Sequence, residues 1–157
     1  MAAIKGKTWL ILLALAIIAF ALGMVFVVQG VTKSSWMSDA MRTEKVTLGL
    51  SNESIAEGNF VDTAAEAQKA GDTIREHRHK IASTYNDLLG GAQFNASDPV
   101  QLTYAQALNM ENYLYLAVLG FGVAQMALGA GAFMLVVAIA LGIISLVLRH
   151  KNVSLKS

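Results

Sequence analysis

Two long stretches without a charged residue, Thr8 to Thr32 and Asn112 to Leu148, constrain this 157-residue sequence most. All 11 Asp and Glu residues lie between them, in the segment 33–111, which also holds seven Lys and Arg and so has a net charge of −4. The other five basic residues lie towards the two ends of the sequence, before the first stretch and after the second. Because Lys and Arg close to span ends are retained in the cytoplasm, we expect a multi-pass plasma-membrane protein with both termini cytoplasmic and the central domain extracytoplasmic.

The first stretch predicts an uncleaved transmembrane helix. Residues 1–7 form a basic cytoplasmic N-terminus, and the span 8–32 exceeds the roughly 20 residues that a membrane crossing needs. Its length is greater than that of a usual signal-peptide core, and no A-x-A cleavage pattern follows it.

The second stretch predicts one crossing that continues an external helix. Asn112 to Leu148 would measure about 55 Å as a helix at ~1.5 Å per residue, against a hydrocarbon core of about 30 Å. Upstream, Asp98 as N-cap, Pro99 as first helical residue and Gln101 three residues after the cap indicate a helix start. We therefore expect a single helix whose part 99–125 is external and whose part 126–148 is the second span, before a cytoplasmic tail 149–157.

The extracytoplasmic domain 33–125 is predicted to contain a helical hairpin. An irregular connector covers 33–61, with weak β alternation near its middle. A helix over 62–89 then begins with a capping box at Thr63 and Glu66 and stops at Gly90-Gly91. Its apolar stripe consists of Ala67, Ile74, Ile81 and Leu88, with Ala70, His77 and Tyr85 between them. Packed against 99–125, this helix completes an all-α membrane protein.

Residues on two surfaces are candidates for a partner interface. On the hairpin they are Ile74, His77 and Ile81. In the spans, small residues recur at four-residue spacing, which lets helices approach closely in lipid. These are Ala19 and Gly23 in the first span, and Ala127, Gly131, Ala138 and Gly142 in the second. Packing between the two spans of one chain is the alternative to packing against a partner.

One pattern suggests a metal site, which would make the chain a metal-dependent enzyme. Glu76-x-x-His79 has the spacing used by carboxylate-bridged di-metal bundles. Such sites need a second pair, and none exists here, so Glu76 and His79 are interpreted as an exposed ion-pair face and no metal or cofactor is expected. His77 and His79 lie about 200° apart on a helix and do not converge on one ion. No motif of nucleophilic catalysis is present.

Other features narrow the classes of partner. Cysteine is absent, which excludes disulfides and thiolate sites, and the acidic domain lacks the basic footprint of a nucleic-acid-binding protein. Tyr104, Tyr113, Tyr115 and Trp36 fit an aromatic belt at the headgroup level or contacts inside the hairpin, with a ligand pocket as the alternative.

The arrangement resembles a family of small uncharacterised two-span membrane proteins of actinobacteria and Chloroflexi-like bacteria. The residues that carry the resemblance are Arg42, Glu44 and Val46, then Val61-Asp62, Ala67-Gln68, and Ile74 with His77. Members are sometimes labelled aromatic-ring-opening dioxygenases. This sequence lacks the paired metal ligands of that activity, so the resemblance implies an architecture and no reaction.

Two functions follow as hypotheses. The first is a non-enzymatic membrane-anchored accessory or structural subunit, whose external hairpin docks on a larger membrane protein complex. The expected partners are a larger integral membrane protein complex or further copies of the chain in a homo-oligomer, together with the lipid bilayer. The alternative is an extracytoplasmic ligand-binding or sensor module that works with a separate transmitter protein. The second hypothesis needs that transmitter because the tail 149–157 is too short for an output domain.

Overall fold

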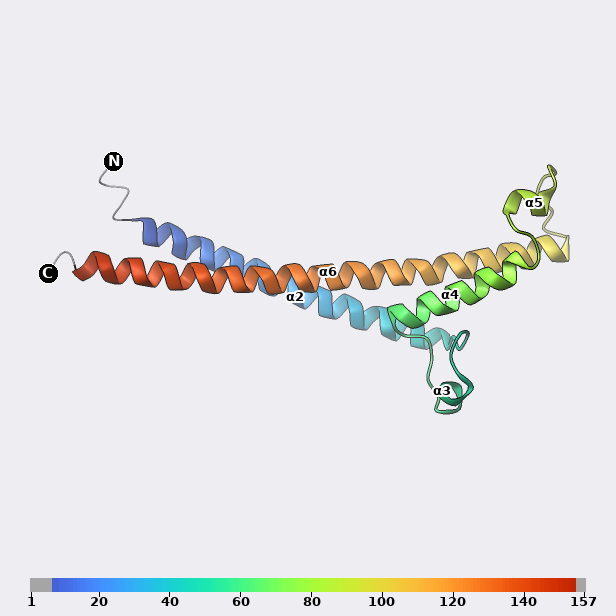
Figure 1. Cartoon of the computed structure of the whole chain (residues 1–157), viewed down its shortest axis with the longest axis horizontal. Helices are drawn as coiled ribbons and strands as arrows, with labels where there is room; N and C mark the ends of the chain where they lie inside the picture. Colours follow the sequence, from blue (N-terminus) through green and yellow to red (C-terminus); the bar gives the residue numbers. More distant parts are fainter. Residues whose placement is uncertain (1–6, 155–157) are drawn as a thin grey trace. The chain divides into compact units, whose positions relative to one another are not determined.

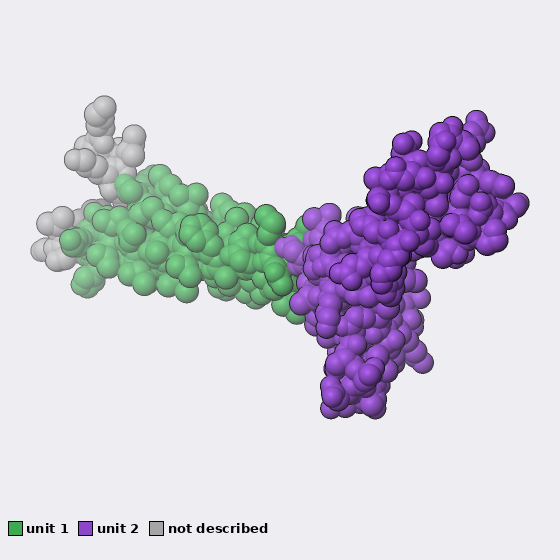
Figure 2. All heavy atoms as spheres, turned by 45° about the vertical axis from the view of Figure 1, so that its right-hand side comes forward, with its two compact units in different colours: residues 1–33, 123–157 green, residues 34–122 purple. Residues whose placement is uncertain are grey.

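Helices make up almost all of the regular structure. The computed structural model describes residues 7–154, and within that range it contains five α-helices and no strand (Figure 1). The two longest, α2 (Thr8–Glu44) and α6 (Pro99–Ser154), are each apolar and long enough to cross a membrane. The predictions of an all-α protein and of two candidate membrane spans are confirmed. The chain divides into a first unit, residues 1–33 with 123–157, and a second unit, residues 34–122 (Figure 2).

In the first unit, α2 and α6 run antiparallel and meet along small residues (Figure 1). Moving seven residues forward along α2, from Gly23 to Gly30, moves the contact seven residues back along α6, from Gly131 to Ala124. A seven-residue repeat of buried positions is the pattern of a left-handed helix pair. The buried members of this seam are Ala16, Gly23 and Gly30 on α2, and Ala124, Gly131, Ala138 and Ser145 on α6.

The two backbones touch where glycines face each other. A Cβ added to Gly23 would lie 3.0 Å from the carbonyl oxygen of Gly131, and one added to Gly131 would lie 2.8 Å from that of Gly23. Between apolar helices in lipid, such close packing is a main source of attraction, because burial of apolar area is not. The Ser145 hydroxyl donates to the Trp9 carbonyl oxygen at 2.7 Å and so joins the helices at one end.

The remaining faces of these two segments expose large apolar side chains, such as Ile17, Met126 and Phe133. In water, a surface of this kind would be a severe aggregation hazard. It suits a helix pair surrounded by lipid tails.

The second unit is built around a small core. Its buried cluster comprises Val61, Ala67, Ala70, Ile74 and Leu114, contributed by the segment before α4, by α4 (Ala64–His79) and by α6. The part of α2 in this unit adds Met41, which is partly buried against the cluster. In Figure 1, α4 lies along the N-terminal half of α6. Two of the five core residues are alanines, so the layer is thin.

The segment 33–61 is more regular than the irregular connector that we predicted. The helix α2 continues to Glu44, because residues 33–44 include no Pro or Gly and Ser38 and Met41 pack within the unit. It ends at Lys45, the one described non-glycine residue with a positive φ, at 51°. The weak β alternation forms no strand among the described residues, although the Val61 amide donates to the Val46 carbonyl oxygen at 2.7 Å. A short helix α3 (Asn52–Ala56) follows, capped by Ser51.

The predicted helix 62–89 is wrong as a single element. The Thr63–Glu66 capping box is present at the start of α4, but α4 stops at His79. A second helix, α5 (Tyr85–Leu89), starts afresh where the Thr84 hydroxyl accepts the Asp87 amide at 3.1 Å. Ser and Thr side chains favour such caps over helix interiors, because they compete for backbone hydrogen bonds.

The ends of the helices that we predicted from turn residues are confirmed. Gly90 has a left-handed φ of 56° and caps α5. Asp98 accepts the amides of Val100 and Gln101 at 2.8 and 3.2 Å, so it is the N-cap of α6. From Pro99 the helix runs unbroken through the second uncharged stretch.

The seam between the helices predicts unequal effects for two neighbouring glycines. Gly131→Ala places a methyl group against the Gly23 carbonyl and should destabilise the helix pair by about 1–3 kcal/mol. Gly129→Ala is the matched control, since nothing lies within 4 Å of its added Cβ. The control gains the same helix propensity and should be neutral or slightly stabilising. Reversible unfolding of the full chain in mixed detergent measures both, and equal effects would contradict the seam.

Candidate functional site

The predicted hairpin interface residues lie in different environments. Ile74 is buried in the core, whereas His77 is exposed and Ile81 lies beyond the end of α4, also exposed. The inward position expected for His77 belongs to Arg78. At about 100° per residue, Arg78 lies roughly 20° from the direction of Ala67, while His77 lies about 80° away. The placement of His77 on the apolar stripe is therefore wrong.

The candidate metal ligands lie on the surface at the end of α4. Glu76 and His79 are both exposed. Within residues 7–154, no three His, Asp or Glu side chains are grouped so that they could hold an ion.

The small residues predicted for a span interface divide into two groups. Gly23, Gly131 and Ala138 are buried in the seam between α2 and α6. Ala19 and Ala127 are half-buried, and a Cβ on Gly142 would meet nothing within 4 Å. Gly142 is therefore not required for packing within the first unit.

A buried ion pair joins α4 to α6 in the second unit. The Arg78 Nε donates to the Glu111 carboxylate at 2.8 Å, and both residues are less than 10% exposed. Arg78 also donates to the hydroxyl of Tyr104, which is fully buried, and its guanidinium lies 4.9 Å from the Tyr104 ring centroid. Hydrogen bonding to Glu111 raises the pKa of Arg78 above its usual value. Every buried polar side-chain atom of the described part is hydrogen-bonded, so this cluster is satisfied.

A second, more exposed polar contact lies nearer the start of α4. The Tyr115 hydroxyl donates to Asp72 at 2.7 Å, and Arg75 pairs with the same carboxylate at 2.6 Å. Gly71 leaves room for the Tyr115 ring, because a Cβ added to Gly71 would lie 2.8 Å from the Cε1 atom of that ring. Burial, and next the hydrogen bond to Asp72, raise the pKa of Tyr115 to about 12. The hydrogen bonds from Tyr115 and Gln68 lower the pKa of Asp72.

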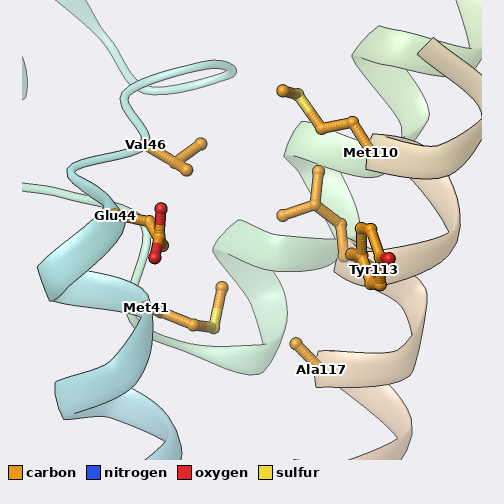
Figure 3. Close-up of a pocket in the computed structure, with 7 residues that line it drawn as sticks. Met41, Glu44, Val46, Met110, Tyr113 and Ala117 are labelled. Atoms are coloured by element: carbon orange, nitrogen blue, oxygen red, sulfur yellow. The ribbon is translucent and has the colours of Figure 1, made fainter. Parts of the chain in front are cut away.

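The third feature is an apolar hollow of about 340 Å³ between the C-terminal end of α2 and the N-terminal half of α6 (Figure 3). Side chains from the two helices face each other across it. Leu114, a member of the buried core, also lines the hollow, so the hollow opens into the core. The full lining is Met41, Glu44, Val46, Met110, Tyr113, Leu114 and Ala117. A concave apolar site of this volume, with few polar groups, is of the kind that binds a ligand or a partner side chain. We take this hollow as the candidate functional site.

Sequence reasoning missed the polar cluster that holds α4 to α6. One signal for it was present: Glu111 is the only charged residue between Pro99 and Leu148. It also shares the helical phase of Ala107 and Leu114, which face the core. A lone acid on an apolar helix face predicts a buried basic partner.

No family model, curated protein or solved structure matches this chain.

Breaking the buried pair should loosen α4. Arg78→Met leaves the Glu111 carboxylate buried without a partner and should cost about 3 kcal/mol or more. Arg75→Met, which removes an exposed pair with Asp72, should cost less than about 1 kcal/mol. Hydrogen exchange of the α4 amides in the full chain measures both. Similar protection in the two variants would contradict a stabilising role for Arg78, and adding Glu111→Leu to Arg78→Met should restore part of the loss.

Tyr115 predicts a pH dependence of its own. Its folded-state pKa of about 12 exceeds the ordinary value of 10, so the stability it contributes is fully present below pH 10 and is lost as pH rises towards 12. The phenolate absorbance of the full chain should contain one transition near pH 12 that disappears in Tyr115→Phe. Asp72→Asn should move that transition to lower pH. A Tyr115→Phe difference titration centred near 10 would refute the assignment.

Proposed function

We propose that this chain is a non-enzymatic, membrane-anchored accessory subunit that docks on a larger integral membrane protein complex. In this proposal α2 and α6 cross the plasma membrane, both termini are cytoplasmic, and α4 with the outer part of α6 forms an extracytoplasmic helical hairpin. The observation that carries it is the hollow beside Leu114, which leaves the core of the second unit open on one side.

The thin core supports a dependence on a partner. Alanines fill two of its five buried positions, and small domains with little buried apolar area are marginally stable by themselves. A partner that binds only the folded form stabilises it by mass action. Large apolar side chains outside the proposed spans 8–32 and 126–148 are also exposed, among them Tyr113 at 72% and Trp36 at 65%. Aromatic residues of this kind are enriched in protein–protein interfaces.

Polar clusters of the second unit support a structural role. The Arg78–Glu111–Tyr104 cluster is closed off from solvent and its groups satisfy one another. A catalytic constellation needs a reachable acid, base or nucleophile beside a concave site. In the hollow, Glu44 is the only charged lining residue.

The second candidate function is an extracytoplasmic ligand-binding or sensor module. One observation favours it: the hollow's volume of about 340 Å³ is within the range of small-molecule sites. Such a module would release a bound small molecule on denaturation and would purify without stoichiometric protein partners.

Affinity purification in a gentle detergent tests the proposal. Tagged at the C-terminus and extracted from native membranes, the full chain should bring down a fixed set of membrane proteins at constant stoichiometry. The same purification is repeated with Gly131→Ala, which alters only the first unit. A lower yield of partner proteins with this variant would show that the packing of the two spans contributes to partner binding. Recovery of a monomer or homodimer only would overturn the accessory-subunit proposal, and a small molecule in that fraction would favour the sensor.

The proposed topology has its own test, which the cysteine-free sequence simplifies. Glu53→Cys in α3 should react with a membrane-impermeant maleimide added to intact cells. Lys151→Cys near the other end of the chain should react only after permeabilisation. Labelling of both positions from outside, or the reverse order, would contradict the proposed orientation.

A further inference from the structure

The hollow is the unfilled edge of the core of the second unit. Leu114 belongs to the buried cluster and also lines the hollow, while Met41, Val46 and Ala117 pack partly buried against that cluster. In Figure 3, Met41 and Val46 face Met110 and Ala117 across the open space. An apolar side chain that enters here would contact the same residues as a core side chain and would lose its water in the same way.

The charge of the Glu44 carboxylate limits which apolar group can occupy the hollow. Glu44 is the only charged residue of the lining, and its carboxylate makes no hydrogen bond or ion pair among the described residues. The nearby Arg42 does not neutralise it, since Arg42 pairs with Asp62. A lipid phosphate would be repelled by this carboxylate, whereas a Lys or Arg would be attracted. The occupant therefore combines an apolar body with a basic group.

The extent of the apolar surface favours a protein segment over a small molecule. Met110 and Tyr113, which line the hollow, are 50% and 72% exposed. Farther along α6, Leu116 and Leu119 are 58% and 62% exposed, so the apolar surface continues past the hollow. An amphipathic helix laid in a groove uses such an extended surface, with anchors at successive turns. Methionine side chains, here Met41 and Met110, adapt their shape to helices that bind in this way.

We infer that this hollow docks an apolar helix of a partner membrane protein. The helix inserts a large apolar side chain towards Leu114 and places a Lys or Arg beside Glu44. The inference rests on the proposed accessory function and names the surface and the partner chemistry for it.

Site-specific photo-cross-linking in native membranes tests this inference. The full chain carries a benzophenone amino acid in place of Tyr113, and the cross-linked peptides are sequenced by mass spectrometry. The expected adduct is one apolar helical segment of another membrane protein that contains a Lys or Arg. Glu44→Lys should reduce the adduct at least tenfold, and reversing the partner's basic residue to Glu should restore it.

Asp39→Lys is the matched control, because Asp39 is exposed on the same helix and does not line the hollow. It should leave the adduct within twofold of the parent chain. Glu44 is the last residue of α2, and a positive charge is favourable at a helix C-terminus. Glu44→Lys should therefore keep the helical content of the parent chain.

Several results would overturn the inference. These are an adduct with lipid, an adduct with a second copy of this chain, no adduct, or an adduct that Glu44→Lys leaves unchanged. If affinity purification of Glu44→Lys still recovers the same partner proteins at the same stoichiometry, the accessory function stands and the hollow is not its docking site. If no partner proteins are recovered with the parent chain, the accessory function itself fails.

Discussion

The second unit depends on the buried ion pair between Arg78 and Glu111. Burying two charges away from water costs free energy unless they pair with good geometry. Removal of one partner leaves the other charge buried and unpaired. The observed alignment of α4 along α6 satisfies both groups together with the Tyr104 hydroxyl, and a shift of α4 by one turn, about 5.4 Å, would break these contacts. The pair therefore selects the register of α4, while the apolar contacts of Ile74 and Leu114 supply the area that is buried. Because alanine-rich contacts alone would tolerate sliding, the polar cluster gives this thin layer its specificity.

A different constraint acts in the first unit, where backbone proximity replaces charge. Gly23 and Gly131 bring the carbonyl of each helix against the other, and the repeat of small residues every seven positions continues that contact along both helices. The pairing buries Gly23, Gly30 and Gly131 and leaves large apolar side chains exposed on the outside of the helix pair, which is the arrangement that lipid favours. In the proposed function, a satisfied helix pair anchors the chain, and the open hollow at Leu114 remains for a partner.

Charge distribution and capping residues were enough to predict the two long apolar helices, the start of α6 at Asp98 and the capping box of α4. The break between α4 and α5 was not predictable from apolar spacing, since Ile81 and Leu88 keep the period while Thr84 restarts the helix. The hollow was not predictable either, because it forms from residues far apart in sequence, such as Val46 and Met110. The contacts between Arg42 and Asp62, and between Val61 and Ala67 in the core, were likewise not evident from the sequence pattern.

The central claim is that this chain is a subunit of a larger membrane protein complex. Its most direct test is the size of the particle that contains the untagged protein after gentle solubilisation of native membranes. Blue-native electrophoresis of gently solubilised membranes, followed by detection of this chain, reports that size without purification. The account predicts one discrete band with a mass far above that of two copies of the 16.7 kDa chain. Migration as a monomer or dimer at every detergent concentration would contradict it.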